Sequence, residues 1–315
     1  MNSKNINITD YDKFKYNYKD YWLKQNREYE DSSDRIAVSR LLNKSDGKSI
    51  IDIGGSFGRL YPMYKDKYKV KIIFDYSFEA LKDASNNLKN DGNTYFVCGD
   101  LYNLPFSSNS IDDVICVRVL HHILDLKTAT GSIARIVKNN IFIEFANKSN
   151  FKNLIFSPSI YFSKGAYSQK TKGTGQGSEQ YDDQIFLNHD PKEFIDIARD
   201  KKFVVKETLS VSNFRSQFLK RIFGLNILIY LEKHLQRTLG IIFFGPSIFL
   251  HLVKDKLNGM NIEYELNNTK DYETFRIEDI LVCPQCQNSL ETNLLCTKCN
   301  KSYRIINGIY VFRDI

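Results

Sequence analysis

The segment that most constrains this chain is the glycine-rich run IDIGGSFGRL at residues 51–60, which continues an apolar stretch beginning at Ser49. An apolar stretch that ends in glycines and then opens into a helix is the strand-loop-helix unit of open α/β sheets. Gly54, Gly55 and Gly58 carry no Cβ atom, so the backbone N–H groups of such a loop can approach a ligand closely. We therefore expect a strand at residues 49–53 and a ligand site at its carboxyl end.

Two acidic residues follow this loop, each at the end of an expected strand. Asp75 ends the run Val70–Phe74, and Asp100 comes shortly after the run Thr94–Cys98. Because the carboxyl ends of parallel strands meet at one edge of a sheet, both acids should lie beside the glycine loop. The Asp75 carboxylate could accept two hydrogen bonds from a ribose diol, and Asp100 could accept one from an exocyclic amine such as adenine N6. The pattern predicts a nucleoside site.

The spacing of the glycines argues against a dinucleotide. A dinucleotide fold uses G-x-G-x-x-G to hold a pyrophosphate on a helix N-terminus. Here Ser56 stands at the third position of that pattern, and Gly58 comes one residue early. A diphosphate ligand is therefore disfavoured.

The motifs after Asp100 complete a series: Leu104-Pro105-Phe106, then residues 110–113, an expected strand Val114–Val117, and Leu120-His121-His122. Together with the glycine loop and the two acids, this series resembles the class I S-adenosylmethionine-dependent methyltransferases. The most similar branch includes the ubiquinone and menaquinone biosynthesis methyltransferases. The resemblance covers residues 50–145, about a third of the chain.

The resemblance implies a role for each matching residue. Asp52, Gly54, Gly55 and Gly58 would form the loop around the methionine part of the cofactor. Asp75 would bind the ribose hydroxyls, and Asp100 with Leu101 would frame the adenine. The chain departs from the family pattern at Ser56, where a glycine is usual, and at residues 135–140, which lack the usual Pro-Gly-Gly turn.

Methyl transfer is a direct displacement at a sulfonium carbon, so alignment of donor and acceptor supplies much of the catalysis. A base is needed only if the acceptor must lose a proton. The chain has no Asn/Asp-Pro-Pro-Tyr run after the fourth strand and no Pro-Cys pair there, which argues against adenine or glutamine N-methylation and against covalent attack on a pyrimidine. His121 and His122 are candidate general bases, with a structural or cofactor-shelf role as the alternative.

Alternating strands and helices from Ser49 to Phe145 predict an α/β fold with a doubly wound, mostly parallel sheet. Strands at 203–211 and 247–253 would close the sheet as an antiparallel pair. We assign residues 1–257 to this methyltransferase domain, with insertions near 152–183, expected as a loop, and near 212–245, expected as helices. The second insertion is densely apolar, which favours core or a homodimer face over contact with a membrane or hydrophobic substrate.

Four of the six cysteines fall within seventeen residues, as two C-x-x-C pairs at Cys283/Cys286 and Cys296/Cys299. Four thiolates brought together in this way form the tetrahedral sulfur set of structural zinc, and such a closed set leaves no open position for catalysis. Residues 280–315 resemble the small zinc-binding proteins that activate methyltransferases as separate subunits. The resemblance implies a fused zinc ribbon that caps the enzyme, joined through a linker at 258–279.

Composition adds limits on location and partners. The chain has 315 residues, 42% of them hydrophobic, a net charge of +7 and a pI near 8.9. We expect a cytoplasmic protein, because no signal-peptide core or membrane-spanning apolar run is present. The basic charge permits binding to nucleic acid or anionic membrane, but its even spread favours an ordinary solvated surface.

Three functions remain open at this point. The first is a methyltransferase acting on a hydroxyl, amine or activated carbon of a small-molecule or lipid-like acceptor. The second is an rRNA or tRNA methyltransferase that uses the basic surface and the zinc ribbon. The third is an inactive scaffold that retains the fold, which only Ser56 suggests.

Overall fold

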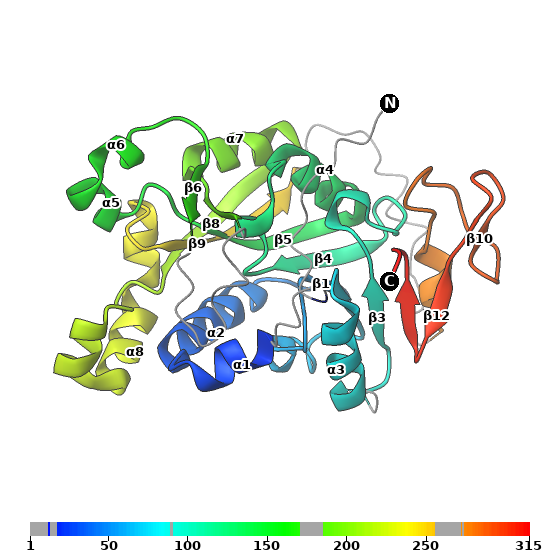
Figure 1. Ribbon diagram of the computed structural model, residues 1–315, viewed down its shortest axis with the longest axis horizontal. Helices are drawn as coiled ribbons and strands as arrows, with labels where there is room; N and C mark the ends of the chain where they lie inside the picture. Colours follow the sequence, from blue (N-terminus) through cyan, green and yellow to red (C-terminus); the bar gives the residue numbers. More distant parts are fainter. Residues whose placement is uncertain (1–11, 13–17, 89–90, 171–184, 256–271, 273) are drawn as a thin grey trace.

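A nine-stranded sheet forms the centre of the protein (Figure 1). The computed structural model describes residues 12, 18–88, 91–170, 185–255, 272 and 274–315. The strand order is β12-β13-β3-β2-β1-β4-β5-β9-β8. The five central strands run parallel, whereas β5–β9, β8–β9 and β12–β13 are antiparallel pairs. The expected doubly wound, mostly parallel α/β fold is confirmed.

The strands of the sheet are β1 (Ser49–Ile53), β2 (Val70–Asp75), β3 (Thr94–Cys98), β4 (Ile111–Cys116), β5 (Val137–Ala146), β8 (Phe203–Val211), β9 (Ser247–Lys254), β12 (Arg304–Ile306) and β13 (Ile309–Val311). Two smaller ladders pair β6 (Tyr167–Lys170) with β7 (Ile185–Asn188), and β10 (Leu295–Cys296) with β11 (Lys301–Ser302).

The helices are α1 (Tyr18–Lys24), α2 (Glu28–Leu42), α3 (Phe78–Leu88), α4 (Leu126–Ile136), α5 (Phe151–Phe156), α6 (Pro158–Tyr161), α7 (Pro191–Asp200) and α8 (Gln217–Ile241). Short 3-10 helices lie at η1 (Tyr61–Met63), η2 (Leu101–Asn103), η3 (Leu120–His122) and η6 (Ile277–Ile280). Figure 1 shows α1, α2 and α3 on one side of the sheet and α4 and α7 on the other.

Neighbouring residues of each central strand pack on opposite faces of the sheet, because side chains alternate along a strand. Ile51 and Ile72 belong to the core beneath α4 and α7, whereas Ile50 and Ile73 belong to the core beneath α2 and α3. All four side chains are fully buried. A strand buried on both faces reads as a continuous apolar run, which is why the sequence located β1 and β2 at their observed bounds.

Two local expectations were wrong. The chain does not enter an α-helix after the glycine loop but forms η1, in which Pro62 has no N–H to donate. β4 begins at Ile111 rather than at Val114, because Asp112 and Asp113 are buried strand residues. Oδ2 of the Asp112 carboxylate accepts hydrogen bonds from the backbone N–H groups of Lys48 and Ser49. These bonds compensate for burying the carboxylate in the sheet.

The C-terminal segment shares the main sheet. β13 pairs in parallel with β3, so that Ile309 lies opposite Phe96 and Val311 opposite Cys98. Ile277, at the end of the expected linker, is fully buried in the same core as β1. The boundary at residue 280 therefore does not separate two sheets. A hydrogen-bonded turn lies around Thr292, whereas the spacing of the cysteines also allows a hairpin there, and the antiparallel ladder of this segment is β10–β11.

The first insertion, expected as a loop, contains the helices α5 and α6 and the strand β6 in its described part. Its residues 171–183 lie outside the described residues, as do residues 258–271 of the expected linker. The second is α8, which is kinked at Gly224, where φ is +69°. Among the described residues, no helix combines the length and apolar character needed to cross a membrane.

Candidate functional site

A cavity of about 420 Å³ lies at the carboxyl ends of β1, β2, β3 and β4. This volume is in the range of pockets that bind cofactors. Five of the residues expected from the sequence line it, namely Gly54, Asp75, Asp100, Leu101 and His122. Four others, Asp52, Gly55, Gly58 and His121, do not border the cavity. The strand ends therefore bring both acids to one site, as the parallel order requires.

The loop after β1 approaches the cavity through Gly54 and Ser56. Gly54 has a φ of +73°, and a Cβ atom there would lie 2.1 Å from Cγ2 of Val119, so only glycine fits without a shift. Ser56 also has a positive φ, of 48°, and its N–H donates to Oδ2 of Asp75 over 2.9 Å. Ser56 therefore adopts a glycine-like backbone, and the departure from the family pattern leaves the loop conformation available.

Asp52, Gly55 and Gly58 support the loop from beneath. The Asp52 carboxylate is buried and accepts the hydroxyl of Tyr64 at 3.0 Å. Burial raises the pKa of Asp52 to about 7, although the Tyr64 hydrogen bond and nearby Arg59 favour the ionised form. A Cβ on Gly55 would press on Asp52 and Ile73. These contacts shape the loop, and the role around the methionine part of the cofactor that the resemblance implies for the three residues stays a prediction.

The Asp75 carboxylate is fixed at the end of β2. Its two oxygens each accept one backbone N–H, from Ser56 at 2.9 Å and from Ser77 at 2.8 Å. An ionised carboxylate has about four lone-pair positions, so Asp75 retains a position that can accept from a ligand. Burial raises the pKa of Asp75 to about 6, and the two N–H donors partly oppose this shift.

Asp100 and Leu101 form the next part of the wall. Asp100 caps η2, and its Oδ1 accepts the Tyr102 N–H at 2.9 Å. Burial raises the pKa of Asp100 as well. Leu101 offers an apolar side chain directly beside this carboxylate. An apolar surface next to a hydrogen-bond acceptor suits a flat heteroaromatic ring with an exocyclic amine.

Several other cavity residues lie outside the motifs that predict the site. Tyr18 and Lys19 come from α1, so this short helix forms one wall of the cavity. Tyr76 follows Asp75, and Arg118 follows the end of β4. The position of Tyr76 beside a predicted ligand residue could have identified it. The others reach the cavity through long-range packing that leaves no local pattern.

Arg118 is the most strongly constrained of these residues. Its φ is +64°, an unusual backbone conformation for a non-glycine residue. Its guanidinium binds the buried Asp34 carboxylate at 2.7 and 3.1 Å, and its N–H donates to Glu144 at 2.8 Å. Asp34 and Glu144 raise the pKa of Arg118 despite its burial. Arg59 shares Asp34, with an ion pair of 3.0 Å. Strain of this kind occurs where a site must be held in place.

The two candidate bases point to different surroundings. His122 lines the cavity, and burial lowers its pKa to about 4, so its imidazole is neutral at pH 7. His121 stacks on Phe186 of β7, with ring centroids 4.4 Å apart. Burial, followed by the neighbouring His122, lowers the pKa of His121 well below its usual value. Only His122 borders the space where a ligand can lie.

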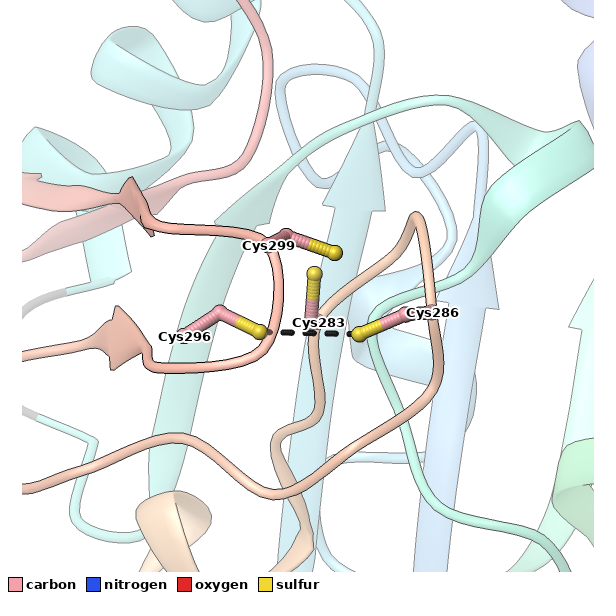
Figure 2. Close-up of side chains that lie close together, drawn as sticks. All are labelled: Cys283, Cys286, Cys296 and Cys299. Atoms are coloured by element: carbon pink, nitrogen blue, oxygen red, sulfur yellow. Dashed lines mark hydrogen bonds between the residues drawn. The ribbon is translucent and has the colours of Figure 1, made fainter.

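The four cysteine side chains meet at one point (Figure 2). They belong to the segment around β10, at the opposite end of the molecule from α8 (Figure 1). Their Sγ atoms all lie within 4.8 Å of one another, and those of Cys286 and Cys296 are 3.5 Å apart. Tetrahedral Zn–S bonds of about 2.3 Å place neighbouring sulfurs about 3.8 Å apart, so the set fits zinc. Asn288 donates to Sγ of Cys286 at 3.2 Å. Such donors stabilise a ligating thiolate.

The two cysteine pairs adopt matching backbone turns. The residue after each second cysteine, Gln287 and Asn300, has a positive φ, of 59° and 51°. Tyr303 places its hydroxyl 3.3 Å from Sγ of Cys283. The repeated turn directs both pairs toward one point, which the regular sequence spacing had predicted.

Comparisons with known proteins agree with this architecture. Residues 51–143 match the family model described as a methyltransferase domain. An uncharacterised protein of Methanocaldococcus jannaschii is 32% identical over 133 residues, which are 40% of this chain and 55% of the relative. The chain thus spans about half the length of that curated relative.

Two solved structures share the fold at low sequence identity. A chain in the complex between the Haloferax volcanii Trm112 methyltransferase activator and a methyltransferase matches with a TM-score of 0.53 and 14% identity, over 80% of this chain and 98% of that one. A Listeria monocytogenes protein described as an S-adenosylmethionine-dependent methyltransferase matches with a TM-score of 0.50 and 11% identity, over 71% and 99%. Residues 51–143 therefore correspond to a methyltransferase domain, and the protein has the fold that these solved structures share.

Proposed function

We propose that this protein transfers a methyl group from S-adenosylmethionine to an oxygen, nitrogen or carbon atom of a small-molecule or lipid-like acceptor. The observation that carries this proposal is the convergence of Gly54, Asp75 and Asp100 on one cavity. These residues lie at the carboxyl ends of β1, β2 and β3, which are neighbours in the sheet. They therefore lie one after another along the cavity, as the successive parts of such a cofactor would.

The charge of the cavity supports the same cofactor. Five acidic residues border it, against two cations. The acids are Asp12, Asp75, Glu79, Asp83 and Asp100, and the cations are Lys19 and Arg118. S-adenosylmethionine carries a sulfonium and an ammonium group, with a single carboxylate. A cavity with an excess of acids favours this net cationic ligand through simple electrostatic attraction.

Each wall of the cavity would hold one part of the cofactor. Asp75 would accept the ribose hydroxyls through its remaining lone pairs, and Leu101 with Asp100 would hold the adenine. The Gly54–Ser56 loop would border the methionine part. When bound, the cofactor supplies an activated methyl group, and the residues of this chain hold it in line with the acceptor.

His122 would act as the base if the acceptor must be deprotonated. The imidazole of His122 is neutral at physiological pH, so it can accept a proton at once. A pKa of about 4 makes it a weak base, which suits acceptors whose proton becomes acidic only as the methyl group is transferred. His121, held against Phe186, would orient its neighbour rather than touch substrate.

We propose that the four cysteines bind one structural zinc ion and that residues 280–315 act as a built-in cap. The sulfur cluster supports the zinc, and the β13–β3 pairing supports the cap. A methyltransferase activator is also present in the Haloferax complex whose chain matches this fold. Here the segment resembling that activator family is part of the same chain.

The arrangement offers less support for an RNA acceptor. A continuous basic face from the cysteine segment to Lys164 would have favoured RNA. Figure 1 places α6, which precedes Lys164, at the opposite end of the molecule from β10 and β11. The cysteine segment and the segment around Lys164 therefore lie at opposite ends of the molecule and do not form one basic face.

The test supplies isotopically labelled S-adenosylmethionine and a cell extract separated into metabolite, lipid, RNA and protein fractions. We expect label in the metabolite or lipid fraction, and mass spectrometry then identifies the acceptor. An Asp75→Ala variant is the matched control and should show no transfer. Label in the RNA fraction alone would mean that the acceptor is RNA rather than a small molecule or lipid. Tight cofactor binding without transfer to any fraction would favour the scaffold function.

A further inference from the structure

Exposed apolar side chains are concentrated in one part of the protein. Eighteen large hydrophobic residues are exposed among the described residues, and thirteen of them lie in or directly after α5, α6 and α8. Phe156 and Phe162 are each 74% exposed, and Phe218 and Ile222 are 68% and 56% exposed. Single exposed hydrophobic residues are normal, but a gathering of this kind marks an interaction surface.

The three helices lie along one end of the molecule (Figure 1). The start of α5 contacts the chain just after α8, where the rings of Phe151 and Phe244 stack with centroids 4.8 Å apart. The Phe151 N–H also donates to the Phe244 carbonyl. The exposed Ile241 and Ile242 lie just before this contact. The helices thus present a joined surface, which we call the α5–α8 end.

The charges of the α5–α8 end have one sign. Residues 149–170 contain lysines and no acid. Residues 213–246 contain one acid, Glu232, which is fully buried and accepts hydrogen bonds from Tyr29, Ser212 and Asn213. Every exposed charge on these segments is therefore basic, including Lys152, Arg221 and Lys233. Apolar residues interspersed with cations complement a surface that is anionic outside and apolar within.

A cationic groove adjoins this end. It lies between α2 and α8, has a volume of about 580 Å³ and is lined by Arg35, Arg40, Lys44, Lys233 and Arg237, without an acid. At its rim Glu207 neutralises Lys44 and Arg237, and Asp31 pairs with Arg35 at 2.6 Å. The guanidinium of Arg40 donates instead to neutral acceptors, the Lys233 carbonyl at 2.6 Å and Gln236 Oε1 at 3.4 Å. The groove can therefore accept a phosphate group.

The surface is rigidly attached to the fold. The Glu232 hydrogen bonds fix α8 to α2 and to the loop after β8. At the base of α5 and α6, the fully buried Lys148 donates to the carbonyls of Ser163 and Gly165 and pairs with Asp190 at 3.4 Å. The exposed apolar residues project from supported elements, so their exposure is a property of the folded structure.

We propose that the α5–α8 end docks on the surface of an anionic phospholipid bilayer. The exposed apolar residues of α5 and α8, with Phe162 after α6, would enter the acyl boundary, and the lysines, arginines and cationic groove would bind headgroup phosphates. Docking would place the enzyme beside lipid-dissolved acceptors. The proposal concerns only this surface and does not depend on the chemistry at the cofactor cavity.

Vesicle co-sedimentation of the full chain, without cofactor, tests the proposal. We expect binding to vesicles of mixed phosphatidylglycerol and phosphatidylcholine, and at least ten-fold weaker binding to pure phosphatidylcholine. Binding should also weaken as salt rises, because the Debye length falls from about 10 Å at 0.1 M to about 3 Å at 1 M. Equal binding to both compositions, or none, would overturn the proposal.

Two double variants locate the contact. Ile222→Ser/Phe223→Ser should reduce vesicle affinity at least ten-fold by removing inserted apolar surface. Arg221→Gln/Lys233→Gln should reduce it about 25-fold, because each cation near an anionic surface contributes about five-fold. Ile305→Ser and Lys301→Gln/Arg304→Gln are matched controls, since these exposed residues lie at the far edge of the sheet. Circular dichroism confirms that every variant is folded.

The alternative partner for this surface is a second copy of the same chain. Analytical ultracentrifugation separates the two cases, because a dimer face would give a concentration-dependent dimer that Ile222→Ser/Phe223→Ser converts to monomer. A dimer of this kind without vesicle binding would overturn the proposal. Vesicle binding that the double variants do not change would overturn it as well.

Discussion

The cofactor cavity and the four-cysteine cluster are built in contrasting ways. The cavity collects residues from Asp12 to Ile123, contributed by α1, by α3, by the ends of four strands and by the loops that follow them. The cysteine cluster is contained in seventeen consecutive residues. One of its four cysteines, Cys296, lies on the two-residue strand β10, and the other three lie in turns and loops. The first depends on the whole sheet for its geometry, whereas the second carries its geometry in local spacing.

This difference extends to what stabilises each region. Both faces of the sheet behind the cavity are fully buried, so hydrophobic burial holds the strand ends in place. The cysteine segment has few buried apolar residues of its own, and Leu281, Leu294 and Phe312 pack into the core of the sheet instead. A segment this small needs a staple, here proposed as zinc.

Loss of zinc should have the largest effect. Structural zinc contributes about 10–16 kcal/mol in comparable small sites, so Cys296→Ser should release the metal and unfold residues 283–302. We expect one zinc per chain in the wild type by mass spectrometry and none in the variant. Hydrogen exchange should show lost protection in this segment, while the amides of β1 and β2 stay protected.

The matched control for this comparison is Cys98→Ser, because Cys98 is buried in β3 and does not belong to the sulfur cluster. It should retain the full metal content. A wild type without zinc whose cysteine segment still resists exchange would refute the structural role of the metal.

Asp34→Asn tests the cavity side of the comparison. The Asp34 side chain is fully buried and pairs with both Arg118 and Arg59, so its neutralisation leaves two buried guanidinium groups short of a counter-charge. Breaking a buried pair in this way costs about 3–5 kcal/mol. Urea unfolding should show this loss in the free energy of unfolding.

Asp31→Asn is the corresponding control, because Asp31 also pairs with Arg59 but is 26% exposed. Its replacement should cost about 1 kcal/mol or less. Equal losses for both variants would mean that the buried network does not hold the cavity wall.

The sequence predicted those parts of each region that follow a local rule. Asp75 and Asp100 were found because acids at the carboxyl ends of parallel strands must meet, and the cysteines because their spacing is repeated. Lys19 and Arg118 were missed because their positions follow from packing between distant elements. The pairing of β13 with β3 was missed for the same reason, since a three-residue strand carries no periodic signal.

Asp75→Ala should weaken S-adenosylmethionine binding at least ten-fold with the fold intact. The change removes charge-assisted hydrogen bonds worth about 1.5–3 kcal/mol each and also frees the Ser56 N–H that shapes the loop. Calorimetry on the folded variant measures the affinity. Asp66→Ala is the control, because Asp66 is exposed and does not border the cavity. Unchanged affinity in Asp75→Ala would contradict the ribose assignment.

The affinity should also depend on pH in a defined window. Burial raises the pKa of Asp75 to about 6, so in the free protein this carboxyl becomes protonated as the pH falls below that value. A ribose diol donates its hydrogen bonds to the ionised form, so affinity should be constant above pH 7 and fall below pH 6. One protonation lowers affinity by at most about ten-fold per pH unit, or 1.4 kcal/mol.

Two other titrating groups define the controls for this pH dependence. Burial raises the pKa of Asp52 to about 7, so Asp52→Asn should be measured in parallel. His122, with a pKa lowered to about 4 by burial, titrates below the window. A pH dependence that persists in Asp75→Asn and disappears in Asp52→Asn would assign the effect to the support beneath the loop.

The smallest predicted effect links the two regions. After β13, the Phe312 N–H donates to the Cys98 carbonyl at 2.8 Å, which carries the chain to the cavity wall. The Arg313 guanidinium then lies 3.8 Å from the ring centroid of Tyr76 and 3.7 Å from Asp12, both of which border the cavity. A cation over an aromatic ring contributes about 0.5–1 kcal/mol, so Arg313→Ala should weaken cofactor affinity about two- to five-fold.

Calorimetry distinguishes this coupling from a general loss of stability. Arg304→Ala, an exposed change on β12, should leave the affinity unaltered. If Arg313→Ala also leaves it unaltered, the cysteine segment and the cavity are independent despite sharing a sheet. The alternative outcome is that Arg313→Ala and zinc removal each lower cofactor affinity by the same factor. The cysteine segment would then act on the cofactor chiefly through the Arg313 side chain, because β13 would be the one route by which the metal site influences the cavity.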